Sequence, residues 1–571
     1  MQAGFPNGGP MPMFFQRCAA TTLHSGGFLR ALAALALLTL GATATPNALA
    51  AKTSPGPLVV RTEQGAIRGA LRDNVREFRG IPYAANTAGN QRWTLPQPAP
   101  HWQGTLDGTN FRDPCAQVAR FNLTEASNEE NCLTVNVSVP ALTVRKAPVL
   151  VYIHGGAWVG GSASLYRLDA LARTGLVVVS VNYRLGALGF LAHPALAPEG
   201  SGAWGIADQR AALRWVQQNI AAFGGDPGNV TIGGESAGAG SVCIHLANAN
   251  LSKGLFHKAI IQSGGCLYPR QKVKQAEQLG LKVAAAVGCS NEATALACLR
   301  AVPLEVLLKK QTELASSGIV SFAPSGGSAV NAVDNTEAMA RGDFLRVPVL
   351  MGATRDEMRL YVAYDLQAGK KLDDANYPQW LQGIYGRTPE EQAAKIPERV
   401  AAQYPVGGAE PAPAVLGTAM TDFMPSIGIG TCLQLHTGET MARYTDLWQW
   451  EFADRDAPVL GVGITPKPDP GFLMGAVHAA ELNYWFPNFD NTHKMVAPDL
   501  APPSQALSNQ MLEFVANFAR TGQPSAAGLP AWPRYTDHTK VMWMEPGKTA
   551  LVNASEVHHC AFWKSLYPNR L

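Results

Sequence analysis

Charged residues are scarce in this chain, and neither sign prevails. Asp, Glu, Lys and Arg make up 16% of the 571 residues, and the net charge is +3. This balance argues against a nucleic acid or an acidic partner that is bound by bulk charge. The patterns C-x-x-C and H-E-x-x-H are also absent, and these patterns mark common thiol redox and zinc sites. We therefore expect neither a metal nor a cofactor.

Long apolar runs are lacking after residue 50. Before it, residues 28–50 combine an arginine-flanked apolar run of about 12–15 residues with a small-x-small ending at Ala48-Leu49-Ala50. A membrane span needs about 20 apolar residues, so this run is short for an anchor. We expect residues 1–50 to be a signal peptide cleaved near Ala50, which leaves a secreted or periplasmic protein without stable membrane insertion.

Short apolar runs rich in β-branched residues recur along residues 51–571. Such runs are typical of strands buried on both faces of a parallel sheet. Helical patterns lie between them, as in 208–223, where apolar residues recur at spacings near three and four. The alternation predicts a single α/β domain with a large, mostly parallel sheet flanked by helices. Residues 360–440 show few strand signals, and we expect a helical cap there. The apolar runs are 147–154, 175–183, 229–234, 258–263, 347–353 and 446–452.

The stretch IGGESAGAG, residues 232–240, places Ser236 two positions from Gly234 and from Gly238. The chain has 56 glycines, so the pattern G-x-S-x-G alone is weak evidence. Its context is more specific, because a strand pattern ends at the motif and a helical pattern begins from it. This is the setting of a nucleophile elbow, in which the glycines permit a tight turn and the serine hydroxyl stands at a helix N-terminus.

A serine nucleophile needs a base, and the base needs an orienting acid, in the chain order serine, acid, histidine for this kind of fold. Asp356 and Glu357 follow the strand pattern 347–353, and either residue fits the acid. His478, one of 12 histidines, follows a loop rich in glycine and proline and is the candidate base. The order and context favour a catalytic role over an ordinary surface or core histidine.

An oxyanion hole requires backbone N–H donors from an early glycine-rich loop. The sequence VYIHGGAWVGG, residues 151–161, supplies such a loop directly after a strand pattern. The N–H groups of Gly155, Gly156 or Ala157, together with that of Ala237, are the candidate donors. A plain glycine turn after a strand is the alternative.

Taken together, these segments resemble the type-B carboxylesterases, the cholinesterase-like branch of the α/β-hydrolases. The resemblance covers residues 57–565 and implies the α/β-hydrolase fold. It is carried by the segments FRGIPYA (78–84), RWTLPQPAP (92–100), EENCLTVNV (129–137), VYIHGGAWVGG (151–161), NYRLGALGFL (182–191), the stretch 208–239, QSGG (262–265), GATRDE (352–357) and GAVHAAELNYWF (475–486).

Carried over by position, the resemblance implies Ser236 as nucleophile, His478 as general base and Glu357 as the acid, which decides between Glu357 and Asp356. The family's oxyanion donors fall on Gly156, Ala157 and Ala237, with Gly155 beside them. Positions that support the triad from behind fall on Glu235 and Ser263.

The resemblance also implies roles for the cysteines. Of nine cysteines, Cys18 lies in the predicted signal peptide, and the other eight belong to an oxidising compartment, where disulfides are the default. Two disulfides match the family, Cys115–Cys132 and Cys289–Cys298. Cys560 matches a third family cysteine, and a Cys432–Cys560 bond is a weaker expectation. Cys243 and Cys266 are expected to be free, with Cys243 as a buried thiol near the helix that follows Ser236. The matched pair Arg92 and Glu130 is expected to be a structural ion pair.

The implied activity is that of a serine carboxylic ester hydrolase that forms an acyl-enzyme on Ser236. Its partner is a small-molecule ester, and the sequence does not set the oligomeric state. The segment between Cys115 and Cys132 contains no tryptophan, which argues against choline esters because a quaternary ammonium is recognised by such a ring. Small to medium or aromatic esters are expected. The alternatives are a lipase for longer acylglycerols, an amidase and, remotely, an inactive adhesion module.

Overall fold

The computed structural model describes residues 56–119, 125–198, 200–268, 271–316, 321–459, 470–487 and 498–571. The predicted signal peptide, residues 1–50, lies outside these described ranges. The chain from Thr53 to Leu571 forms one compact unit. No helix within the described ranges is both long and apolar enough to cross a membrane.

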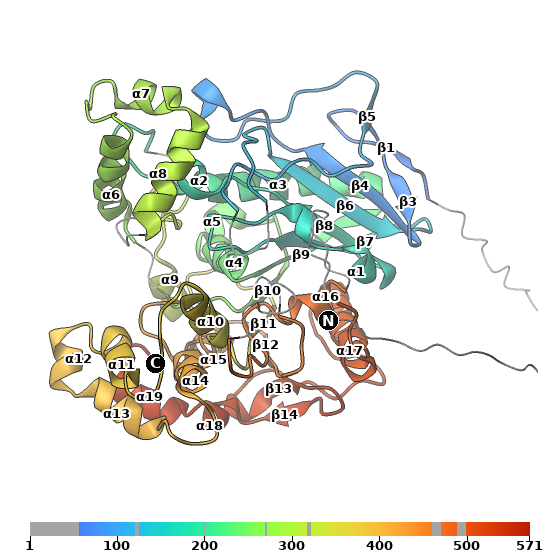
Figure 1. The fold of residues 1–571 in the computed structure, drawn as a ribbon. Helices are drawn as coiled ribbons and strands as arrows, with labels where there is room; N and C mark the ends of the chain where they lie inside the picture. The colour runs from blue at the N-terminus through green and yellow to red at the C-terminus, as the bar shows by residue number, and fades with distance from the viewer. Residues whose placement is uncertain are drawn as a thin grey trace, which may run out of the picture. The chain divides into compact units, whose positions relative to one another are not determined.

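A large mixed sheet runs through the unit (Figure 1). The strands are parallel from β13 to β8 in the order below, and the strands at both edges are antiparallel to their neighbours. The six apolar runs of the sequence all become strands of its centre. Across the sheet, the described strands are β14 (Ala550–Val552), β13 (Val541–Met544), β12 (Leu447–Phe452), β11 (Val349–Thr354), β10 (Lys258–Gln262), β9 (Gly225–Glu235), β7 (Ala147–Ile153), β8 (Val177–Val181), β6 (Thr134–Pro140), β4 (Val75–Pro82) and β3 (Ala70–Arg72).

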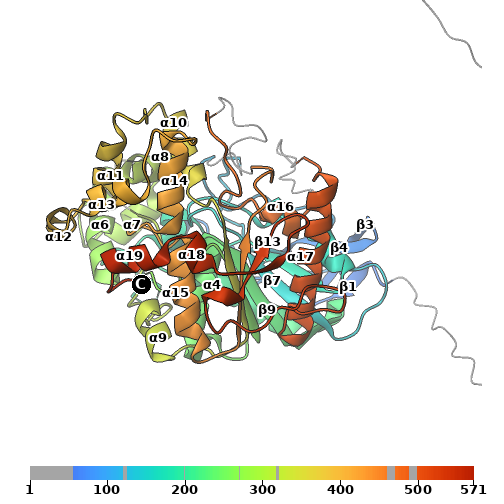
Figure 2. The ribbon, with the colours of Figure 1, turned by 90° about the horizontal axis from the view of Figure 1, so that it is seen from below.

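The central strands are apolar without alternation because helices cover both faces of the sheet. In β7, Val149 and Val151 pack into one core, together with α3 (Trp204–Asn219) and α4 (Ala237–Ala247). Leu150 and Tyr152 point to the other face and pack with α1 (Asp169–Arg173) and α17 (Pro502–Thr521). Figure 2 shows α4 and α17 on opposite sides of the sheet. The expected α/β-hydrolase architecture is therefore confirmed.

Helices fill the segment that the sequence marks as a cap. Helices α10 and α14 pack against each other, as do α11 and α13, whereas α15 packs against β11 and β12 of the sheet. The bounds are α10 (Arg359–Gln367), α11 (Tyr377–Tyr385), α12 (Pro389–Ala393), α13 (Ile396–Gln403), α14 (Ala412–Asp422) and α15 (Thr431–Ala442).

The remaining described elements are shorter or lie at the periphery. A small separate sheet joins β1 (Val59–Arg61), β2 (Ala66–Arg68) and β5 (Thr105–Asp107). The other helices are α2 (Gly186–Phe190), α5 (Ala249–Ser252), α6 (Val273–Ala286), α7 (Ala295–Ala301), α8 (Leu304–Ser316), α9 (Asn335–Arg341), α16 (Leu482–Trp485), α18 (Ala554–Val557) and α19 (Cys560–Leu566).

Four disulfides cross-link the described chain, and they indicate an extracellular or periplasmic protein. The Cys115–Cys132 and Cys289–Cys298 bonds are present, and so is the weaker expectation, Cys432–Cys560. The expectation of a free Cys243 is wrong, because Cys243 on α4 bonds to Cys266 after β10. Sequence spacing could not show this pair, since only the packing of α4 against β10 brings the two side chains together. Arg92 forms the expected ion pair, with two 2.7 Å hydrogen bonds to Glu130.

Candidate active site

Ser236 occupies a strained turn between β9 and α4. Its backbone has φ 55° and ψ −118°, a conformation that side chains rarely adopt. The turn passes so close to β7 that a Cβ atom at Gly238 would lie 2.0 Å from the carbonyl oxygen of Ile153. At Gly234, a Cβ atom would lie 2.6 Å from the backbone of Gly238. The two glycines are therefore required for the elbow that the sequence predicts.

His478 and Glu357 meet beside this turn. Nδ1 of His478 lies 2.6 Å from Oε2 of Glu357, and both side chains are buried. The other carboxylate oxygen of Glu357 accepts a hydrogen bond from the N–H of Thr354 at 2.9 Å, at the end of β11. The His478 N–H donates to the carbonyl oxygen of Glu357 at 3.2 Å. The acid is thus fixed on both sides and can hold one orientation of the imidazole ring.

Glu235 faces the other nitrogen of the same ring. Oε1 of Glu235 lies 3.0 Å from Nε2 of His478. Burial raises the pKa of Glu235 to about 7, although the charge of His478 acts in the opposite direction. Burial would lower the pKa of His478, but the charges of Glu235 and Glu357 raise it to about 9. The carboxylate of Glu235 therefore stabilises an imidazolium. Glu235 also lines a cavity that opens beside Ser236.

A third buried carboxylate, Glu481, completes the surroundings of His478. Burial raises its pKa well above the ordinary value, and the negative charges of Glu235 and Glu357 add to this effect. One oxygen of Glu481 accepts a hydrogen bond from Gln262 at 3.2 Å, and Gln262 in turn accepts one from Tyr152 at 2.8 Å. Glu481 lies within the segment GAVHAAELNYWF, three residues after His478, but the sequence analysis assigned it no role.

The hydrogen bonds of the four expected oxyanion donors separate Gly155 from the other three. Gly156, Ala157 and Ala237 line the cavity around Ser236. Ala237 is the first residue of α4, so its N–H has no partner within the helix. The N–H of Gly155 instead donates to the hydroxyl of Tyr166 at 3.4 Å, and neither residue lines the cavity. Three of the four candidates thus remain available to a developing oxyanion.

Two other sequence candidates, Ser263 and Asp356, form no hydrogen bond with the ring of His478 in the described part of the chain. Ser263 is fully buried, and its hydroxyl has no hydrogen-bond partner among the described residues. Asp356, the alternative acid, forms ion pairs with Arg359 at 3.3 Å and Arg455 at 3.2 Å. Glu357 is the member of the Asp356–Glu357 pair whose carboxylate meets His478.

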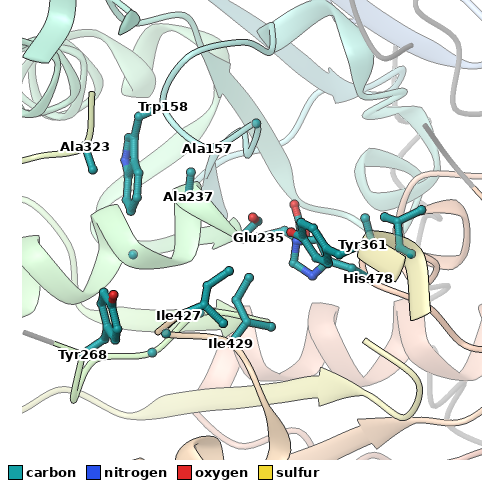
Figure 3. A pocket seen from close by; sticks show the side chains of 18 of the residues that line it. Ala157, Trp158, Glu235, Ala237, Tyr268, Ala323, Tyr361, Ile427, Ile429 and His478 are labelled. Atoms are coloured by element: carbon teal, nitrogen blue, oxygen red, sulfur yellow. The ribbon is translucent and has the colours of Figure 1, made fainter. Parts of the chain in front are cut away.

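A cavity of about 340 Å³ opens beside Ser236 and His478 (Figure 3). Trp158, Ala323 and Tyr268 lie on one side of it, and Tyr361 lies with His478 on the other. Trp485 and Phe486, which end the segment 475–486, do not line the cavity and are buried against aromatic neighbours. The other large apolar side chains that line the cavity are Leu360, Tyr364, Ile427 and Ile429, and none of these belongs to a segment that carries the resemblance.

The described residues contain no group of three or more His, Cys, Asp or Glu side chains placed to hold a metal ion.

The family model described as "Carboxylesterase family" matches residues 56–563 of the chain. The chain belongs to the carboxylesterase family. It is a carboxylic ester hydrolase. Among curated members, acetylcholinesterase from Bungarus fasciatus is 31% identical over 90% of this chain and 87% of its own length. Fumonisin B1 esterase from Sphingopyxis macrogoltabida is 32% identical over 88% of this chain and 89% of its own.

The same family relationship holds for esterases with solved structures. Para-nitrobenzyl esterase from Bacillus subtilis (strain 168) is 32% identical over 84% of this chain and 93% of its own length. A PNB esterase structure superimposes with a TM-score of 0.71 at 28% identity and covers 89% of this chain and 99% of that one. A thermophilic PNB esterase gives a TM-score of 0.72 at 28% identity, covering 88% and 99%. The fold and the family thus agree along nearly the whole chain.

Proposed function

We propose that this carboxylesterase acts through an acyl-enzyme on Ser236, with His478 as general base and Glu357 as the acid that orients it. The observation that carries the proposal is the 2.6 Å contact between His478 and Glu357 beside a strained serine turn that opens on a cavity. Ser236 follows β9, Glu357 follows β11, and His478 lies in the loop before α16. The site is therefore assembled from segments that are far apart in the sequence.

The proposed reaction follows from these positions. His478 takes the proton of the Ser236 hydroxyl as the serine oxygen attacks the ester carbonyl carbon. The carbonyl oxygen becomes an oxyanion held by the N–H groups of Gly156, Ala157 and Ala237. His478 then protonates the leaving alcohol, and water repeats the two proton transfers to release the acid. Glu357 stabilises the imidazolium in both halves of the reaction.

Small to medium or aromatic esters suit the cavity. Its volume of about 340 Å³ and its walls of Trp158, Tyr268, Tyr361 and Tyr364 favour flat apolar groups. The relative named for para-nitrobenzyl esters supports an aromatic alcohol. A lipase lid would present large apolar side chains to solvent, but residues 359–442, all described, expose none.

We further propose that the protein is exported and that residues 1–50 are removed near Ala50.

Labelling with a fluorophosphonate probe tests the proposed nucleophile. The wild-type protein should be modified on Ser236, and Ser236→Ala should not react. His478→Ala should label at least 10³-fold more slowly with its melting curve nearly unchanged, following the order of magnitude for triad losses, about 10⁴. Equal labelling of wild type and Ser236→Ala would contradict the proposal.

A series of p-nitrophenyl esters of increasing acyl length, compared with benzyl esters, tests the proposed substrate class. A preference for the longest acyl chains would contradict that class.

A further inference from the structure

The loop that carries His478 has no regular secondary structure of its own. Residues 470–478 contain neither a helix nor a strand, and the side chain of Leu473 within it is 54% exposed. A general base has to stay within hydrogen-bond reach of the proton it moves. The loop must therefore be held by something outside itself.

Asp356 is tied to the backbone of this loop from both sides. Its N–H donates to the carbonyl oxygen of Ala476 at 2.9 Å, and its Oδ2 accepts from the N–H of Ala476 at 3.0 Å. The loop approaches so closely that a Cβ atom at Gly475 would lie 2.3 Å from Oδ2 of Asp356. Gly475 also has φ +71°, which favours glycine. Two residues before His478, the chain is thus fastened to the end of β11.

Two guanidinium groups extend this attachment. Arg359 forms an ion pair with Asp356 at 3.3 Å and donates to the carbonyl oxygen of Leu473 at 2.8 Å. Arg455, which follows β12, donates to both oxygens of Asp356 at 3.2 Å. Glu410, which precedes α14, accepts from Arg359 at 2.9 Å on each oxygen and lies 3.6 Å from Arg455.

These four side chains form one neutral network, with two carboxylates against two guanidinium groups. The Arg359 and Asp356 side chains are only 2% and 5% exposed, so each needs the opposite charge to offset its lost hydration. A buried ion network adds little net stability over apolar packing, but it permits only one arrangement of its members. Its bonds end on two backbone groups of the loop, Leu473 and Ala476.

We propose that the network Asp356–Arg359–Arg455–Glu410 positions His478 for catalysis by fixing the loop 473–478 to β11, β12 and the segment before α14. The inference rests on the proposed role of His478 as general base. None of the four side chains lines the cavity, so they act through the loop and not on the ester. A displacement of about 1 Å at the base lowers the rate by roughly 10²-fold, which sets the expected size of the effect.

The test compares steady-state kinetics of Asp356→Asn, Arg455→Met, Arg455→Lys and Glu410→Gln on p-nitrophenyl butyrate. The matched control is Asp365→Asn, which removes an exposed ion pair between Asp365 on α10 and Lys370, three residues after the end of that helix. Active sites are counted by fluorophosphonate titration, so that kcat refers to folded protein alone. Arg455 and Glu410 are 29% and 43% exposed, so their variants should fold even if Asp356→Asn does not.

We expect kcat to fall about 10²-fold in Asp356→Asn and about tenfold in Arg455→Met and Glu410→Gln, with KM within twofold of wild type. Arg455→Lys should recover most of the loss, and Asp365→Asn should match wild type. A wild-type kcat per titrated site in Arg455→Met and Glu410→Gln, with only the melting temperature lowered, would overturn the inference. If Ser236→Ala still labels, the proposed function fails first and this inference falls with it. If Ser236→Ala does not label and the network variants keep the wild-type kcat, the proposed function stands and only the inference about the network is overturned.

Discussion

At the scale of single residues, the unusual feature is the number of carboxylates around one histidine. Glu357 and Glu235 each lie within hydrogen-bond distance of one ring nitrogen of His478, and their charges raise its pKa to about 9 although burial opposes this. A general base acts only in its neutral form, so a raised pKa moves the acidic limb of the activity profile towards higher pH. The same charges favour the imidazolium that the proposed mechanism requires.

Replacing Glu235 by Gln should separate these two effects. The substitution removes a negative charge 3.0 Å from Nε2, so the pKa of His478 should fall and a larger neutral fraction should exist at lower pH. We expect the acidic limb of kcat/KM, measured between about pH 5 and about pH 11, to shift to lower pH by about one unit or more. Glu337→Gln, an exposed carboxylate on α9, is the control. A limb at the wild-type pH in Glu235→Gln would show that Glu235 does not set the charge of His478.

At the scale of elements, a second buried histidine joins the last part of the chain to the rest. His558, at the end of α18, lies 2.6 Å from Asp422 at the end of α14 and 2.6 Å from Glu451 in β12. Burial would lower its pKa, but the charges of Glu451 and Asp422 raise the pKa to about 10. The structure thus stabilises the cationic form of His558 between a cap helix and a central strand.

This arrangement makes stability depend on pH in a defined direction. The folded-state pKa of His558 lies above its ordinary value near 6.5, so its contribution is complete below about pH 6.5 and is lost as pH rises towards 10. His558→Gln should lower the free energy of unfolding at pH 6 by about 3–5 kcal/mol, because two buried carboxylates lose their partner. Denaturant unfolding at pH 6, 8 and 10 measures this, and the difference between wild type and variant should shrink with rising pH.

His538→Gln serves as the comparison for His558. The His538 side chain is 31% exposed and lies 3.0 Å from Glu439, so its loss should cost about 1 kcal/mol or less. A constant difference between wild type and His558→Gln from pH 6 to 10 would contradict a charged His558.

At the scale of the whole molecule, the four disulfides close loops of very different length. The Cys432–Cys560 bond spans 128 residues and attaches α19 to α15, whereas Cys289–Cys298 spans 9. Longer loops lose more conformational entropy in the unfolded chain when they are closed. The long cross-link should therefore contribute most to the stability of the compact unit.

Paired alanine variants test this order. Removal of Cys432–Cys560 should lower the free energy of unfolding by about 5 kcal/mol, and removal of Cys289–Cys298 by about 2.5 kcal/mol. Chemical denaturation under oxidising conditions gives both values. An equal loss in the two variants would show that native packing and not loop closure decides the contribution of each bond.

Much of the fold could be predicted because it depends on local patterns. Continuous apolar runs predicted the six central strands, since strands buried on both faces need no polar side. The helix expected at 208–223 begins earlier, as α3 from Trp204, and its last turn is a 3-10 turn, Ile220–Phe223. The outermost strands, β3 and β14, gave weaker signals because each is only three residues long and partly exposed.

The sequence by itself determined the elbow at Ser236, because two glycines around a serine between strand and helix patterns restrict the backbone to one kind of turn. It also limited the candidate acid to two adjacent residues and gave His478 as the candidate base. Only the tertiary structure decided that Glu235 faces His478, that Cys243 bonds to Cys266 and that Asp356 holds the histidine loop. Glu235 and His478 are 243 positions apart, and Asp356 and Ala476 are 120 apart. Local sequence patterns cannot predict such contacts, because the contacts form only when the helices and strands pack together.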